Sequence, residues 1–290
     1  MTPAYVLPVD KPSGPTSHDV VGLARRALGT RRIGHTGTLD PFASGLLLLC
    51  VGGATRIAEY LSAQDKTYEA TLELGRATDT DDRMGQIRAQ DDAWRAVTDA
   101  DVVGVLTGFQ GAQLQTPPPY SAKKVAGERA YDRARRGETV ALEAVPVDIH
   151  ALEALAFAPP RLDFRVTCSS GTYVRALARD IGAALGTSAH LTELRRTAVG
   201  RFRVEEALVP EALGDAERVR ATALSPLHAL GHLPRVALQA DEVRRIRHGQ
   251  ALPPPSGVGA GVCALSHEDE LVAVAEVGPD ALRPRKVFAW

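Results

Sequence analysis

The sequence predicts an α+β protein whose C-terminal end forms a small, separate β-rich unit. In the first part of the chain, apolar residues recur at helical spacing over residues 17–28 and alternate with polar ones over residues 66–74. Near residues 231–234 the sequence pattern changes, and short apolar runs separated by turn residues follow. With 290 residues, 44% of them hydrophobic, the chain is long enough to build two cores.

Four elements are expected in the first third of the chain. They are a helix over residues 17–28 that Gly29 ends, a buried strand over 46–51, a short helix over 54–61 and a strand over 66–74. In the last of these Tyr68 shares a face with three apolar residues, so spacing alone favours a core tyrosine. Residues 76–85, RATDTDDRMG, are interpreted as an exposed loop and not as a calcium-binding loop, because Met84 and Gln90 occupy the required glycine and glutamate positions.

The middle and end of the chain supply the remaining elements. They are a proline-rich extended connector over residues 113–120, a basic helix-like stretch over 121–136, a strand over 162–168, a helix opening at Gly171 and Thr172, and a basic turn over 193–197. After residue 235 we expect a short strand, a helix over 241–248, a proline-rich turn and three β-type runs over 262–265, 271–277 and 285–290.

The composition limits which cellular compartment and which kinds of site the chain can have. The longest apolar run, residues 46–51, is far shorter than a membrane-spanning helix, and the first residues lack the pattern of a secretory signal. Cys50, Cys168 and Cys263 lie far apart and form no C-x-x-C pair, which argues against a zinc site and against a disulfide framework. We therefore expect a cytoplasmic protein without a membrane contact.

The net charge of −1 means that any nucleic-acid binding must depend on a local basic surface. Two basic clusters occur, one over residues 123–136 and one formed by Arg195, Arg196, Arg201 and Arg203, while acidic residues gather elsewhere. A segregated surface of this kind can hold a phosphate-binding face, and a mixed, solvated surface is the alternative.

The most informative segment is residues 34–45, GHTGTLDPFASG, which place Asp40 in a glycine-punctuated turn directly before the apolar run. Pro41 drives Asp40 toward extended backbone angles, and the glycines permit positive φ or close approach of another chain segment. A carboxylate on a loop that a rigid scaffold holds is typical of a catalytic group, whereas a plain Asp-Pro turn is the alternative.

The pattern G-H-x-G-x-L-D-x-x-A-x-G resembles the catalytic motif of the TruB family of pseudouridine synthases. Two further segments resemble the same family: residues 10–14, DKPSG, and residues 168–177, CSSGTYVRAL. The resemblance spans nearly the whole chain. It implies the pseudouridine synthase fold, with a central mixed or antiparallel sheet flanked by helices, over residues 1–230, and an RNA-gripping insertion at about residues 89–147. Residues 235–290 resemble, more weakly, the small β-barrel PUA domain that binds RNA.

The resemblance also implies a role for each matching residue. Asp40 is the nucleophile, Arg175 pairs with it, Tyr68 stacks on the target base and takes part in proton removal, Leu194 packs under the uracil, Tyr173 shapes the pocket, and His35 fills the space that the extruded nucleotide leaves. Arg175 falls in the first turn of a helix, where a cation opposes the helix dipole, so a negative partner is expected on physical grounds as well. RNA contacts are expected from Lys11, Lys123, Lys124, Arg195 and Arg196. The family needs no metal and no cofactor.

The function implied is isomerisation of uridine 55 in the T loop of tRNA, by a monomer without an obligate protein partner. A glycosidase is a competing enzyme class, but it needs a second carboxylate as general acid, and the motifs supply none. The catalytic subunit of an RNA-guided pseudouridylation complex shares these motifs. A non-catalytic tRNA-binding or folding protein is the third alternative, although a carboxylate facing phosphates would only weaken such a binder. The sequence leaves open whether the chemistry proceeds by attack on the sugar, by attack on the base or through a glycal.

Overall fold

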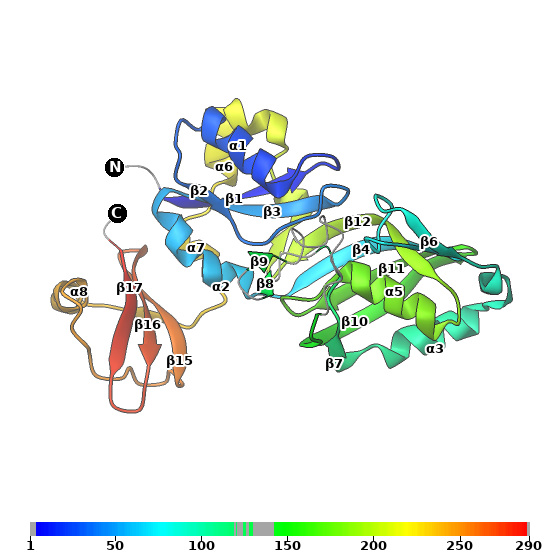
Figure 1. Ribbon diagram of the computed structural model, residues 1–290. Coiled ribbons are helices and arrows are strands. Elements are labelled where there is room, and N and C mark those ends of the chain that lie inside the picture. The colour runs from blue at the N-terminus through cyan, green and yellow to red at the C-terminus, as the bar shows by residue number, and fades with distance from the viewer. Residues whose placement is uncertain (1–3, 119, 121–123, 126–127, 130–141, 289–290) are drawn as a thin grey trace.

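A nine-stranded mixed sheet dominates the part of the chain that the computed structural model describes, residues 4–118, 120, 124–125, 128–129 and 142–288 (Figure 1). Its main path runs through β1 (Tyr5–Lys11), β3 (Ser44–Val51), β12 (Ala189–Val199), β4 (Lys66–Leu74), β11 (Arg161–Cys168), β10 (Val145–Ala158) and β7 (Gly111–Gln115), with β2 (Ile33–His35) beside β3 and β13 (Phe202–Arg203) beside β12. Neighbouring strands are antiparallel except β3 and β12, which are parallel and share only two register pairs. The α+β class with a central mixed sheet is thus confirmed, and the sheet consists of two halves that meet at β3 and β12.

The N-terminal half is buried on both faces. Thr16 caps helix α1 (Ser17–Ala27) by a capping box with Asp19, and the helix covers the face of β3 that carries Leu47 and Leu49. The opposite face of β3 packs against the short helices η1 (Gly52–Ile57) and α2 (Ala58–Ser62). Burial on both sides explains why this strand is an unbroken apolar run rather than an alternating one.

Among the described residues, helices cover the other half of the sheet on one face. In Figure 1, α5 (Val174–Ala184) and α3 (Asp99–Gly108) lie over β11, β10 and β4. Tyr68, Phe164 and Leu194 belong to the core between these helices and the sheet. Thr67 and Glu69 alternate with Tyr68 along β4 and therefore lie on the opposite, more polar face.

Short elements complete the unit built on the nine-stranded sheet. They are β5 (Arg76–Thr78), β6 (Ile87–Gln90), η2 (Ala93–Ala96), β8 (Lys124–Val125), β9 (Glu128–Arg129), η3 (Val204–Glu206), η4 (Pro210–Gly214), α6 (Ala216–Thr222) and α7 (Pro226–Ala229). β5 pairs with β6, and β8 pairs with β9. Among the described residues, no helix is both long enough and apolar enough to cross a membrane.

Three expectations about local structure need correction. Residues 193–197 are part of β12 and form no turn, because their charged side chains find partners on both faces of the sheet. The turn between β5 and β6 is not fully exposed, since Asp81 and Asp82 are buried. The four described residues of the stretch 121–136 form the hairpin of β8 and β9 instead of a helix, and the rest of that stretch lies outside the described residues.

The C-terminal strands form a sheet of their own, as expected. β14 (Arg235–Ala237), β15 (Gly261–His267), β16 (Glu270–Val277) and β17 (Leu282–Val287) lie side by side, and α8 (Ala240–Arg247) packs on one face. The other face contributes Leu271, Val274 and Phe288 to the core around β3, and α2 and α7 lie between the two units (Figure 1). The small sheet therefore packs on the unit with the nine-stranded sheet through a shared apolar core.

Candidate active site

The loop that carries Asp40 connects β2 to β3 and is held by the turn that follows β1. The buried Lys11 ammonium and the Gly14 amide donate to the Pro41 carbonyl at 3.4 and 2.8 Å, and the Ser13 hydroxyl donates to the Phe42 carbonyl at 2.8 Å. The DKPSG segment therefore supports the loop that carries Asp40.

Helix α1 fixes the residue directly before Asp40. The Ser17 hydroxyl donates to the Leu39 carbonyl at 3.0 Å and accepts from the Leu39 amide at 2.8 Å. Both groups are buried, so neither hydrogen bond can be replaced by water without cost. The sequence analysis missed Ser17 because a serine at a helix start is ordinarily explained by capping alone.

Arg196 of β12 holds the same loop from the other side. It is buried, and its guanidinium donates to the Leu46 carbonyl at 2.7 Å and to the Gly37 carbonyl at 3.1 Å. At this point β3 approaches β12 so closely that a Cβ on Gly45 would lie 2.3 Å from the Arg196 carbonyl oxygen. Gly45 also has φ +106°, which is a region that favours glycine.

Asp40 and Arg175 form a two-pronged ion pair between the two halves of the sheet. Arg175 Nε lies 2.9 Å from Asp40 Oδ2, and Arg175 Nη2 lies 3.2 Å from Asp40 Oδ1. The Arg175 side chain is only 6% exposed, whereas the Asp40 side chain is 33% exposed. The carboxylate is therefore held on one side by a buried cation and open on the other.

The turn between β5 and β6 supplies two further partners of Arg175. Arg175 Nη1 donates to the Thr80 carbonyl at 2.8 Å, and Nε lies 3.6 Å from Asp82 Oδ2. The other Asp82 oxygen accepts from the Thr80 hydroxyl and from the Met84 amide. The sequence analysis expected one negative partner for Arg175 and found Asp40, but it missed Asp82 because the segment had the composition of an exposed loop.

Tyr68 and Leu194 lie on adjacent strands and on the same sheet face as Arg196, since Leu194 pairs with Ala70 and Arg196 with Tyr68. Burial raises the pKa of Tyr68, and the charge of Arg196 lowers it. The phenol is therefore neutral in the free protein, and Arg196 is the group beside it that would favour a tyrosinate.

His35 and Tyr173 are half-buried at the edges of this region. His35 Nδ1 accepts from the Gly37 amide at 3.3 Å. Burial lowers the pKa of His35, and the charge of Arg196 lowers it further, so the imidazole is neutral near pH 7. Tyr173 is the N-cap residue of α5 and is bound through its backbone to Gln115.

Of the five residues expected to contact RNA, the structure describes the side chains of Lys11, Arg195 and Arg196, and these do not form one exposed surface. Lys11 and Arg196 are buried and spend their donors on backbone carbonyls, so the structure supports a structural role for both. Burial also lowers the pKa of Lys11 to about 8. Arg195 is partly exposed but paired with Asp10 at 2.7 Å. Lys123 and the side chain of Lys124 lie outside the described residues.

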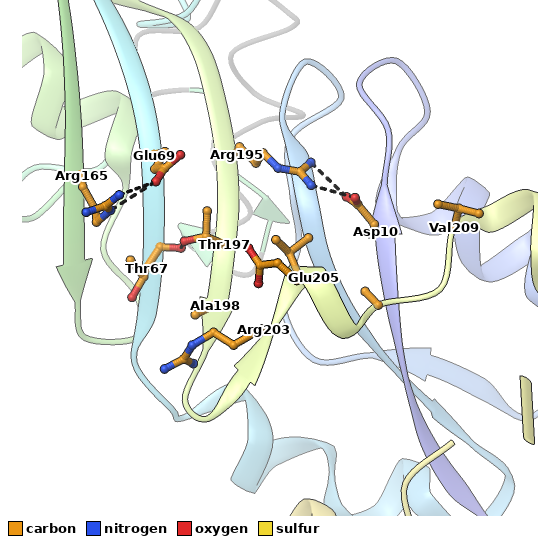
Figure 2. Close-up of a pocket in the computed structure, with 12 residues that line it drawn as sticks. Asp10, Thr67, Glu69, Arg165, Arg195, Thr197, Ala198, Arg203, Glu205 and Val209 are labelled. Atoms are coloured by element: carbon orange, nitrogen blue, oxygen red, sulfur yellow. Dashed lines mark hydrogen bonds and ion pairs between the residues drawn. The ribbon is translucent and has the colours of Figure 1, made fainter. Parts of the chain in front are cut away.

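A polar cavity of about 630 Å³ lies on the sheet face opposite Tyr68 (Figure 2). Thr67 and Glu69 line it, and two arginines in its walls are already neutralised, Arg165 by Glu69 and Arg195 by Asp10, both at 2.7 Å. Asp40 does not line this cavity, so the candidate active site lies elsewhere. Within the described part of the chain, no group of three or more histidine, cysteine or acidic side chains is arranged to hold a metal ion.

Two family models match consecutive parts of the chain. The model described as "TruB family pseudouridylate synthase (N terminal domain)" matches residues 25–174, and the model described as "tRNA pseudouridylate synthase B C-terminal domain" matches residues 175–230. The first match includes His35, Asp40 and Tyr68, and the second includes Arg175 and Leu194.

Similar proteins cover the whole length of the chain. The tRNA pseudouridine synthase B of Thermobifida fusca (strain YX) is 44% identical and covers 98% of both chains. The protein of the same name from Azoarcus sp. (strain BH72) is 44% identical over 98% of this chain and 94% of its own.

Solved structures share the fold at lower identity. A Cbf5-Nop10-Gar1 complex matches with a TM-score of 0.78 and 29% identity, over 98% of this chain and 85% of the other. An H/ACA RNP bound to a substrate RNA containing 2'-deoxyuridine matches with a TM-score of 0.76 and 28% identity, over 99% and 85% of the two chains.

Proposed function

Because the chain belongs to the TruB family of pseudouridylate synthases, we propose that it isomerises a uridine of tRNA to pseudouridine, at position 55 in the T loop. The T-arm stem-loop is the part of the RNA that it recognises, and the chain works as a cytoplasmic monomer without a metal or cofactor. The observation that carries this proposal is the Asp40–Arg175 pair, a carboxylate that is charge-compensated on one side and open on the other.

The reaction needs an ionised carboxylate beside a flipped base. It breaks the bond between uracil N1 and ribose C1′, turns the base and joins C5 to C1′, while the hydrogen on C5 leaves as a proton and N1 gains one. Asp40 acts as the nucleophile: its carboxylate bonds to the substrate as the bond between N1 and C1′ is exchanged, and it is released again when C5 has joined C1′. Arg175 keeps the carboxylate charged and oriented.

The surrounding residues suit a base taken out of its stack. Extrusion costs a few kcal/mol, which a close pocket with aromatic and apolar walls offsets. Tyr68 and Leu194 supply those walls from neighbouring strands, and Tyr173 limits the pocket at the start of α5. A neutral His35 suits a wedge in the space that the nucleotide leaves, since such a wedge replaces a stacked base without adding charge. Passage of the C5 proton to Tyr68 requires that Arg196 stabilise the tyrosinate.

A hydrolase would need a second carboxylate free to act as an acid on the glycosidic bond. Asp82 lies beside the ion pair, but it is buried and already held by Thr80, Met84 and Arg175. Its position favours a supporting role for the pair over proton transfer to a leaving group.

The test is Asp40→Asn, assayed by tritium release from C5-labelled uridine in a tRNA transcript and in a T-arm stem-loop. We expect no release from the variant and unchanged RNA affinity, since the amide keeps the shape of the side chain and loses the charge. Asp92→Asn, at an exposed carboxylate that pairs with its neighbour Arg95, is the matched control and should remain fully active. Tritium release by Asp40→Asn would refute the assignment of Asp40 as the nucleophile. If the wild-type protein releases no tritium from any tRNA, the proposed function is refuted.

The catalytic subunit of an RNA-guided complex is the second candidate, and the similarity to the Cbf5 structures is the observation that favours it. The higher identity and nearly full coverage of the tRNA pseudouridine synthase B relatives favour the stand-alone enzyme. Activity of the purified chain on a tRNA transcript without any guide RNA separates the two.

A further inference from the structure

Two arginines one helical turn apart on α5 hold the same two chain segments. Arg175 donates to the Thr80 carbonyl at 2.8 Å and to the Tyr120 carbonyl at 2.9 Å. Arg179 binds the neighbouring residue of the first segment, the Asp81 carboxylate, at 3.1 Å, and the Thr116 carbonyl of the second segment at 3.1 Å. The two guanidinium groups therefore bridge the β5–β6 turn to the connector that follows β7.

Gln115 ties the same connector to the start of α5. Its side-chain oxygen accepts from the Tyr173 amide at 2.8 Å, and its side-chain nitrogen donates to the Tyr173 carbonyl at 3.1 Å. Gln115 is only 4% exposed, so this reciprocal pair is sheltered from water. Gln115, the last residue of β7, is thereby fixed to Tyr173, which precedes Arg175 by two residues.

The β5–β6 turn needs Arg179 for its own geometry. Asp81 is buried, has φ +59°, and its carbonyl accepts from the Leu191 amide of β12 at 3.0 Å. Burial raises the pKa of Asp81, and the charge of Arg179 opposes that rise. A buried carboxylate in a left-handed residue persists only where its surroundings compensate it.

We propose that Arg179 and Gln115 are positioning residues for the reaction. They fix the Thr80 and Tyr120 carbonyls, and these carbonyls hold the Arg175 guanidinium in the plane of the Asp40 carboxylate. Neither residue touches the reacting atoms. The inference rests on the proposed function and adds to it the groups that align the catalytic ion pair.

The experiment compares Arg179→Met, Arg179→Lys and Gln115→Leu in single-turnover pseudouridine formation at saturating enzyme. Arg179→Met should lower the rate at saturation by about tenfold or more, because small displacements of catalytic groups cost that much or more, while the Kd for the transcript stays within about twofold. Arg179→Lys should fall between it and the wild type, since one ammonium can compensate Asp81 but cannot also replace the planar fork. Gln115→Leu should show the same loss of rate at unchanged affinity.

A double-variant cycle tests whether Arg179 acts through Arg175. If it does, adding Arg179→Met to Arg175→Lys should lower the rate little further, because the alignment that Arg179 provides is already lost. Losses that multiply would contradict the proposal. Arg88→Met is the matched control, since Arg88 lies beside the same turn, is exposed and binds Asp79 on the surface, and it should match the wild type.

The outcomes separate the inference from the function on which it rests. An inactive wild-type protein would refute the function. An active wild type with an unchanged rate in folded Arg179→Met, or with a loss in affinity alone, would refute the positioning role. If Arg179→Met does not fold, the rates of Arg179→Lys and Gln115→Leu in the same assay test the positioning role instead, and unchanged rates in both would refute it.

Discussion

At the scale of the residue, the site depends on one guanidinium that serves several acceptors at once. Arg175 makes two hydrogen bonds to Asp40 and one each to the carbonyls of Thr80 and Tyr120. Only a planar fork can meet a carboxylate in this two-pronged way while its other N–H groups point to fixed carbonyls.

Replacement of Arg175 by lysine keeps the charge and removes the fork. We expect Arg175→Lys to lower the rate constant of pseudouridine formation by about a hundredfold, because the carboxylate loses its orientation although it keeps a cation nearby. Single-turnover kinetics with a tRNA transcript measures this effect. Arg165→Lys, on the opposite sheet face, provides the control, and a wild-type rate in Arg175→Lys would contradict the role of the fork.

Lys66 provides a test in the alkaline range. Its buried ammonium donates to the carbonyls of Ser62 and Gln64, and burial lowers the pKa of Lys66 to about 8. Between about pH 7.5 and about pH 9 the folded protein loses a proton that the unfolded chain retains, so the free energy of unfolding rises with pH. Lys66→Met should remove part of that rise.

Urea unfolding of both proteins at the two pH values measures the difference. Lys11, whose pKa is also lowered to about 8, contributes a rise of the same sign in both proteins and therefore cancels in the comparison. Equal pH dependence in wild type and variant would contradict the assignment of this titration to Lys66.

At the scale of the element, the contact between β3 and β12 assembles the site. β3 follows the Asp40 loop, while β12 carries Leu194 and Arg196. Only two register pairs join the strands, so the side-chain hydrogen bonds of Arg196 to Gly37 and Leu46 carry much of the connection.

Gly45→Ala should disturb this contact directly. The added Cβ would meet the Arg196 backbone at 2.3 Å, and the backbone at φ +106° disfavours any other residue, so we expect a loss of about 2 kcal/mol or more in the free energy of unfolding. Urea unfolding gives the value. Gly34→Ala is the matched control, because a Cβ there meets nothing within 4 Å, and a near-wild-type Gly45→Ala would show that the strands can separate freely.

The spacing of apolar residues along the chain predicted some strands well and others poorly. Residues 66–74 alternate cleanly and form β4 with those same bounds, because one face is buried and the other is polar. Residues 193–197 carry no such alternation of polarity, since Arg196 points into the interior and Arg195 to the opposite face. A buried arginine that satisfies backbone carbonyls hides a strand from any pattern that counts apolar residues.

At the scale of the whole molecule, the N-terminal half of the large sheet and the C-terminal unit share one core. Leu46 and Leu48 of β3 pack in the same cluster as Val274 and Phe288. Arg56 stacks over the Phe288 ring at 4.8 Å from its centroid and donates to the Val287 carbonyl at 2.6 Å. We propose a domain boundary near residues 231–234 and a PUA-like, RNA-binding character for residues 235–290.

Phe288→Ala should weaken both units together. Loss of a buried phenylalanine costs about 3 kcal/mol or more, and the cavity would open onto β3 as well as onto the C-terminal sheet. Hydrogen exchange should therefore rise in peptides from α2 and β3 along with those from β16. Leu114→Ala, at an exposed side chain, is the control, and faster exchange confined to the C-terminal sheet would show that the two units open independently.

Local periodicity, turn chemistry and motifs were enough to predict the α+β class, the separate C-terminal sheet, the family and the contact between Asp40 and Arg175. The folded chain was needed to show that Lys11 and Arg196 are interior supports, that Asp82 lies beside Arg175, and that Gln115 and Arg179 bind the connector to α5. Each of these facts joins residues far apart in the chain. A charged side chain looks the same in a sequence whether water or a buried carbonyl accepts its hydrogen bonds, and only packing distinguishes the two.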